Sequence, residues 1–125
     1  MIVTEPQRET LARESEAPDV ALAAIDRELA AQGSPAAQRA WQRTRALVAA
    51  RAGRVDTLAA AQDALARLAK EGDPLAVADA DLARAALEEQ RGQTQLAATS
   101  AQSAAEAYAR YCGSQVVPRA DCDYR

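Results

Sequence analysis

Two short stretches of the sequence, Gly33-Ser34-Pro35 and Gly72-Asp73-Pro74, decide the fold. In each stretch, glycine favours the end of one helix, Ser or Asp favours the N-cap of the next helix, and proline favours its first turn. The second stretch repeats the pattern of the first further along the chain. The two stretches therefore predict that helices begin near residues 35 and 74, within units that repeat along the chain.

The glycines extend this pattern, because they recur at nearly even intervals and each can end a helix. They are Gly33, Gly53, Gly72, Gly92 and Gly113. Apolar and small residues recur at helical spacing between them. The sequence predicts five helices, at about 18–32, 35–52, 56–71, 74–91 and 94–111, and a shorter sixth helix within 4–16.

The expected core is made mainly of alanine, because the chain has one Trp, one Met and no Phe. Alanine is the best helix former, and the scarcity of β-branched and aromatic residues argues against sheets. The helical spacing predicts these core positions: Leu22, Ile25, Leu29, Ala37, Trp41, Thr44, Val48, Leu58, Ala61, Leu65, Leu68, Leu75, Ala78, Leu82, Ala86, Ala97, Ala101, Ala104, Tyr108 and Tyr111.

Connections this short place consecutive helices side by side and antiparallel. The predicted fold class is therefore all-α, with five to six antiparallel helices stacked as helical hairpins. The interval from Gly33 to Gly72 is the same as that from Gly53 to Gly92, so the chain is expected to form one helical-repeat domain, 1–125. Its hairpins span 4–33, 34–72 and 73–112, and an irregular tail follows at 113–125.

The hairpin pattern resembles the tetratricopeptide repeat. The matching residues are Ala46 and Ala85 before the turn, Gly53 and Gly92 in it, and Leu58 and Ala97 after it. The resemblance covers about residues 35–111. The repeat interval is longer than the period of the family, which is about 34 residues, and the large aromatic residues of the family are missing. The resemblance implies an α-solenoid in which the first helix of each pair lines a concave groove.

That groove would hold a peptide or a helix of a protein partner. Carried over by distance from the turn glycine, the resemblance implies these partner-binding residues: Arg43, Arg51, Asp79, Glu89 and Gln90. Their mixed charge suits a partner segment that is itself mixed in charge or amphipathic. The architecture, together with the lack of catalytic motifs, favours a non-catalytic interaction or scaffold module. Fourteen Arg against a single Lys, Lys70, and the excess of Ala are typical of codon bias in a GC-rich bacterial genome. The module is therefore expected to be, for example, the sensory or adaptor part of a larger bacterial signalling protein.

The same charged residues have a structural interpretation. Arg51, Asp79 and Glu89 project into helical arcs that Leu and Ala otherwise occupy. Helices at 35–52 and 74–91 would stack side by side in a solenoid, so Arg51 is expected to form an ion pair with Asp79 or Glu89.

An arginine ridge offers an alternative function. Arg39, Arg43 and Arg54 project within an arc of about 60° on one helical wheel. Such a ridge would bind nucleic acid or another polyanion through phosphate contacts, as part of a small regulatory domain. Trp41 projects to the opposite side and cannot stack bases on it, which makes nucleic acid the less favoured partner.

The sequence predicts no catalytic residue, metal ligand or cofactor. The chain has no histidine, which excludes Ser-His-Asp and Cys-His catalysis and any His-containing metal site. It also lacks a phosphate-binding glycine loop. We expect neither an enzyme nor a small-molecule substrate. The net charge of −3 with interleaved signs argues against a polyanion, and no apolar run approaches the ~18 residues needed for membrane insertion.

The compartment depends on two cysteines, Cys112 and Cys122, which either form a disulfide or remain free thiols. A disulfide would favour an extracytoplasmic site, such as the periplasm, over the cytoplasm. Tyr108 and Tyr111 are expected to cover the open end of the array, or to dock the tail when Cys112 and Cys122 pair. If a further repeat is missing there, the same end could form a homodimer.

Overall fold

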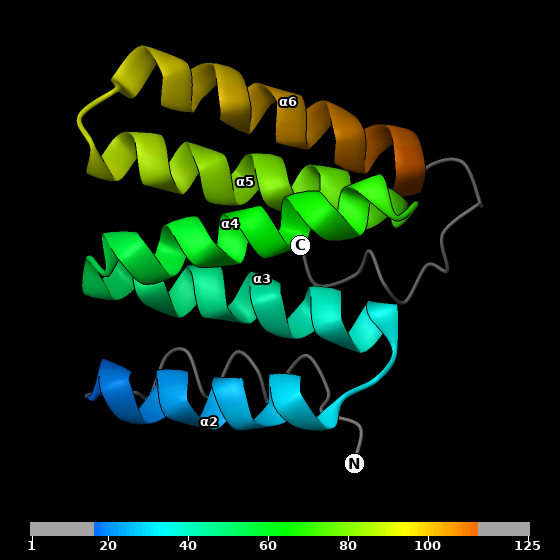
Figure 1. Cartoon of the computed structure of the whole chain (residues 1–125). Helices are drawn as coiled ribbons and strands as arrows, with labels where there is room; N and C mark the ends of the chain where they lie inside the picture. The colour runs from blue at the N-terminus through cyan, green and yellow to red at the C-terminus, as the bar shows by residue number, and fades with distance from the viewer. Residues whose placement is uncertain (1–16, 113–125) are drawn as a thin grey trace.

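The computed structural model describes residues 17–112, and this part of the chain is all helical. Its five helices are α2 (Pro18–Ala31), α3 (Pro35–Ala52), α4 (Val55–Lys70), α5 (Pro74–Gln90) and α6 (Thr94–Cys112). They stack in chain order, with α2 at one end and α6 at the other (Figure 1). The all-α prediction is confirmed, and each helix bound lies within one residue of its prediction. The helix expected within 4–16 and the tail at 113–125 lie outside the described residues.

The caps explain why the helices begin and end where they do. The Ser34 side chain accepts a hydrogen bond from the backbone N–H of Ala37 at 3.1 Å, and Asp73 caps α5 in the same way. At the other end of α3, Gly53 has a φ of 69°, in the left-handed region that favours glycine. Gly92, which follows α5, has a φ of 75°. The chain therefore reverses direction within a few residues at these turns.

Three apolar clusters form the core, and each occupies a different joint between helices. Trp41 and Val48 of α3 pack with Ala21, Leu22 and Ile25 of α2. The central cluster joins α3, α4 and α5. The third cluster joins α5 to α6. The central cluster consists of Ala46, Ala49, Leu58, Ala61, Leu65, Ala80, Ala83 and Leu87.

Helices α3 and α5 run in the same direction, one on each side of their shared partner α4. Near their starts, Arg39 of α3 contacts Asp73 and Asp79. Near their ends, the side-chain amide of Gln90 donates a hydrogen bond to the backbone oxygen of Ala50 at 2.9 Å. Residues that lie side by side on α3 and α5 are therefore about one repeat interval apart in the sequence. The two helix start signals have the same spacing. The finer tetratricopeptide-like arrangement stays a prediction.

Most expected core positions are buried, and the exceptions lie at the edges of the helical faces. Leu82 is 41% exposed and Ala101 is also exposed, so both assignments to the core were wrong. Ala83, the next residue, packs into the central cluster instead of Leu82. Ala101 lies on the outer side of the last described helix, where no further described helix covers it. Half-buried positions are Leu29, Ala37, Leu68, Ala86 and Tyr111.

Candidate functional site: a buried charge cluster

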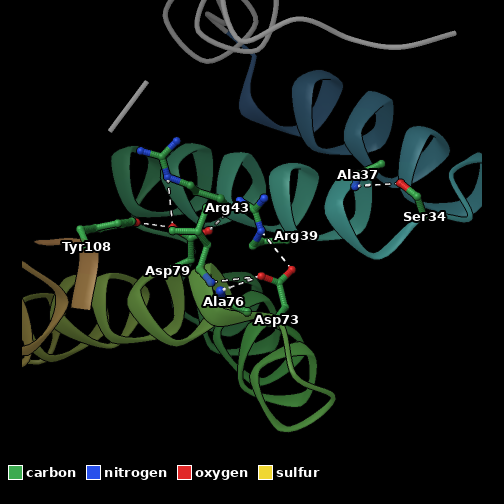
Figure 2. A network of polar contacts seen from close by, with 9 residues as sticks. Ser34, Ala37, Arg39, Arg43, Asp73, Ala76, Asp79 and Tyr108 are labelled. Atoms are coloured by element: carbon green, nitrogen blue, oxygen red, sulfur yellow. Dashed lines mark hydrogen bonds and ion pairs between the residues drawn. The ribbon is translucent and has the colours of Figure 1, made fainter. Parts of the chain in front are cut away.

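A carboxylate lies inside the fold, at the point where α3, α5 and α6 meet. Asp79, in the second turn of α5, is 3% exposed. Figure 2 shows its side chain between Tyr108 on one side and two arginines of α3 on the other. Arg43 Nε lies 3.5 Å from Asp79 Oδ1, and Arg39 Nη1 lies 3.6 Å from Asp79 Oδ2. The two guanidinium groups therefore offset part of the cost of burying this charge.

Arg39 connects the buried carboxylate to the start of α5. It is itself 3% exposed, and its Nε donates a hydrogen bond to Asp73 Oδ2 at 3.1 Å. The other oxygen of Asp73 accepts from the backbone N–H groups of Leu75 and Ala76 at 3.1 and 3.3 Å. One aspartate thus caps α5 and binds Arg39 at the same time. The cap, the arginine and Asp79 form one connected polar network.

Tyr108 closes the network from α6. Its hydroxyl donates a hydrogen bond to Asp79 Oδ1, and its ring is buried in the α5–α6 cluster. Burial, followed by the charge of Asp79, raises the pKa of Tyr108 well above its ordinary value of 10.0. The tyrosine therefore stays protonated and acts as a donor. Burial also raises the pKa of Asp79 above 3.8, against the opposing effects of Tyr108, Arg43 and Arg39.

The expected ion pair of Arg51 was wrong. In the described structure Arg51 is exposed and makes no ion pair with Asp79 or Glu89, and Glu89 is exposed at the far end of α5. Only Asp79 of these three residues lies in the core. The physical reason is the register of α3 and α5, which places Asp79 beside Arg39. Arg51 lies several turns further along α3, about 18 Å away along the helix axis.

The predicted partner-binding residues occupy two environments on α3 and α5. Asp79 is buried and Arg43 is half-buried beside it. Arg51, Glu89 and Gln90 lie towards the opposite ends of the same two helices, outside the core. No partner chain is present, so their role in binding stays a prediction.

The three arginines of the proposed anion ridge do not share a surface. Arg39 is buried and paired with aspartates of α5. Arg54 lies beyond the end of α3, at the N-cap of α4, and its Nη2 is 2.9 Å from Asp19 of α2. The helical wheel failed because Gly53 ends α3 before Arg54. Arg43 lies one turn from Arg39 on the same side of α3 and is half-buried against Asp79.

The last residue of α6, Cys112, is disulfide-bonded. The chain has one other cysteine, Cys122, which lies outside the described residues. The pairing of Cys112 with Cys122 is the one that the composition allows within a single chain. Its expected consequence for the compartment stays a prediction.

Residues 17–112 show neither a metal site nor a membrane-spanning helix. These residues contain no cluster of three or more His, Cys, Asp or Glu side chains that could hold a metal ion. Within the same range, no helix combines the length and the apolar character needed to cross a bilayer. Comparison with protein-family models, with curated proteins and with solved structures finds no match to this chain. The function of the site must therefore be inferred from the geometry of the residues described above.

Sequence reasoning identified Asp79 and Arg43 but missed the partners that complete the site. Tyr108 was assigned to the core, without a polar role. Asp73 was recognised as a helix cap, and its second contact with Arg39 was not expected. The available signal was the repeat interval between the start signals, which places Asp79 at the level of Ala40, directly beside Arg39.

Proposed function

We propose that this chain is a non-catalytic protein–protein interaction module, serving as a scaffold or as the sensory or adaptor part of a larger bacterial signalling protein. A peptide or a helix of the partner would lie across α3 and α5. The observation that carries this proposal is that two parallel, adjacent helices both present exposed apolar and charged side chains beside a rigid polar network.

Leucines on both helices support an apolar contribution to binding. Leu47 of α3 and Leu82 of α5 are each 41% exposed. Arg51 on α3 and Glu89 on α5 add charges of opposite sign outside the core. A partner segment that alternates apolar and charged residues would complement both properties.

The rigid part of the surface is the half-buried Arg43. Its Nε contacts Asp79, which also accepts a hydrogen bond from Tyr108, so the arginine side chain is held at a defined place. A fixed charged group loses less conformational entropy when a partner binds than a mobile one does. This arrangement supports peptide binding better than the alternative polyanion function, since Arg39 and Arg54 are committed elsewhere.

The outer face of α6 supports a second copy of the chain as one partner. Ala98, Ala101 and Ala105 lie on one side of this helix and are exposed. The equivalent positions of α4, one repeat interval earlier, include Ala59 and Ala66, which pack against the central cluster. In a homodimer through α6, the second chain would cover these alanines of α6, whose counterparts on α4 are half-buried within the fold.

The proposal is tested with a displayed library of random short peptides selected against the full-length protein. Affinities of the selected peptides are then measured for Arg43→Glu and Arg51→Glu, with helicity followed by circular dichroism. Arg67→Glu is the matched control, because Arg67 is an exposed arginine on α4 and not on the proposed binding helices α3 and α5. We expect roughly tenfold weaker binding for both test variants and unchanged binding for the control.

Two results would contradict the proposal. One is a selection that yields no peptide with measurable affinity. The other is an equal loss of affinity in the Arg67→Glu control, which would indicate a general charge effect. Arg51→Glu keeps the test meaningful if Arg43→Glu fails to fold, because Arg51 makes no ion pair with the described acidic residues of α5.

A further inference from the structure

The last turns of α6 are anchored on the first turns of α5. Tyr111 and Cys112 pack against the buried cluster that contains Leu75, Ala78 and Tyr108. Among the described helices, α5 and α6 share the most extensive contact of any pair. The point at which the chain leaves α6 therefore has a defined position beside the start of α5.

A disulfide keeps part of the tail, residues 113–125, close to this point. Cys112 is disulfide-bonded and Cys122 is the only other cysteine, so the bond within the chain joins these two residues. The Cα atoms of a disulfide lie about 4.4–6.8 Å apart, and those of neighbouring residues about 3.8 Å apart. Asp121 and Asp123, on either side of Cys122, therefore have Cα atoms within about 11 Å of the Cα of Cys112.

Two arginines of α3 lie near the same point. Cys112 is one helical turn beyond Tyr108, about 6 Å along the axis. The Tyr108 hydroxyl donates to Asp79, and Asp79 contacts both arginines (Figure 2). The side chain of Arg39 is 4% exposed, whereas that of Arg43 is 20% exposed. Of these two arginines, Arg43 is the one that a further group can approach from the solvent side.

The charge of Arg43 suits an aspartate. The single charge of Asp79 is shared between two guanidinium groups, and Asp73, the other acid of the network, also caps α5. A guanidinium carries five N–H donors, so Arg43 can bind a second carboxylate in addition to that of Asp79. The acids of the tail are Asp121 and Asp123, and these are the residues that the disulfide holds nearby.

We propose that Asp121 and Asp123 bind Arg43 and so occupy part of the binding surface on α3 and α5. The disulfide of Cys112 holds them there as an internal ligand. The inference rests on the proposed function, because it concerns the surface that the partner would use. A partner segment has to displace the two aspartates before its own side chains reach Arg43. Since a tethered group competes at high effective concentration, the tail lowers the apparent affinity for the partner.

Zero-length cross-linking of the full chain tests this contact with no partner present. Arg43→Lys places an amine at this position, and a carbodiimide joins an amine to a carboxylate within ion-pair distance. The chain has one natural lysine, Lys70, which keeps other cross-links few. The matched control is Arg51→Lys, at an exposed position further along α3. We expect mass spectrometry of the digest to find position 43 joined to Asp121 or Asp123, with about tenfold less product from position 51.

Replacing both cysteines by serine releases the tether and completes this test. In Arg43→Lys, the yield of the cross-link to the two aspartates should then fall about tenfold, because the effective concentration of the tail falls. Circular dichroism verifies that each variant keeps its helicity. Equal yields from positions 43 and 51, or no product between position 43 and the tail, would overturn the inference. A yield that is the same with and without the disulfide would overturn the role of the tether.

Peptide affinity measures the consequence for binding. Asp121→Asn combined with Asp123→Asn removes the competing charges of the tail. The matched control, Asp63→Asn combined with Glu71→Gln, removes the same charge from exposed positions on α4 and at its C-cap. We expect the selected peptides to bind about tenfold more tightly to the tail variant and equally well to the control. Unchanged affinity in the tail variant would contradict the competition. The cross-link needs no peptide, so a failed peptide selection leaves it intact and the two proposals fail separately.

Discussion

Two of the places where charged residues join helices in residues 17–112 differ strongly in their exposure to water. At the α3–α5 joint, the side chains of Arg39 and Asp79 are 4% and 2% exposed. At the α2 end, the side chains of Arg54 and Asp19 are 45% and 76% exposed, although their atoms are closer, at 2.9 Å. The shorter contact is therefore expected to be the weaker one. Distance alone does not rank ion pairs, because exposed charges are screened by solvent.

The burial of the charges between α3 and α5 has a second consequence. Each charge at the α3–α5 joint depends on its partners, because an unpaired charge inside the fold is costly. Either charge at the α2 end can lose its partner and be hydrated instead. The inner cluster thus fixes the register of α3 against α5, whereas the outer pair tolerates change.

The largest expected effect is that of Arg39→Ala. This substitution leaves Asp79 with less compensation and removes a partner from the cap residue Asp73. Breaking a buried pair on one side costs about 3–5 kcal/mol. Urea denaturation should therefore show a large drop in the free energy of unfolding. A loss below about 1 kcal/mol would place the pair in the same class as the exposed ones.

The next effect is a pH dependence that separates Asp79 from the exposed acids. Because burial raises the pKa of Asp79 above 3.8 in the folded protein, the folded state binds this proton more tightly than the unfolded state does. Its contribution to stability is fully present below pH 3.8 and is lost as pH rises through the folded pKa. Above that pKa, a further rise in pH no longer changes the effect of Asp79 on the free energy of unfolding.

Asp79→Asn removes this titration and serves as the reference. The difference in free energy of unfolding, wild type minus variant, should fall as pH rises from 3.8 through the folded pKa of Asp79. Urea titrations at a series of pH values measure it. A difference that rises with pH would mean that Arg39 and Arg43 outweigh the effect of burial.

The smallest effect is expected at the exposed pair. Arg54→Ala removes a contact with Asp19, and both residues can then be hydrated. The expected cost is about 0–1 kcal/mol, and salt at about 1 M should reduce it further. Thermal denaturation with and without salt checks both statements. A cost as large as that of Arg39→Ala would remove the difference between the two joints.

The helices of this fold could be predicted from the sequence because their limits depend on local chemistry. Ser34 and Asp73 accept backbone hydrogen bonds as N-caps, and Gly53 takes the left-handed conformation that ends α3. These interactions join near neighbours in the chain and are visible in the sequence. Their prediction does not depend on how the helices pack.

The polar site could be predicted only in part, because it depends on register. Helical wheels compare directions around one axis and contain no information on distance along a neighbouring helix. They correctly placed Asp79 inward and wrongly paired it with Arg51. The interval between the two start signals contained the missing information, since it aligns Asp79 with Ala40, next to Arg39. The repeat relates α6 to α4, but it does not specify which side chains of α6 and α5 pair, so the contact of Tyr108 with Asp79 could not be predicted from it.

The most direct test of the central claim is a pair of double-mutant cycles, one at each joint. Free energies of unfolding are measured for the single and double alanine variants of Arg39 with Asp79, and of Arg54 with Asp19. We predict a coupling energy of about 1.5–3 kcal/mol at the buried joint and below about 0.5 kcal/mol at the exposed one. Equal couplings at the two joints would contradict the claim that a buried charge cluster holds α3 and α5 in register.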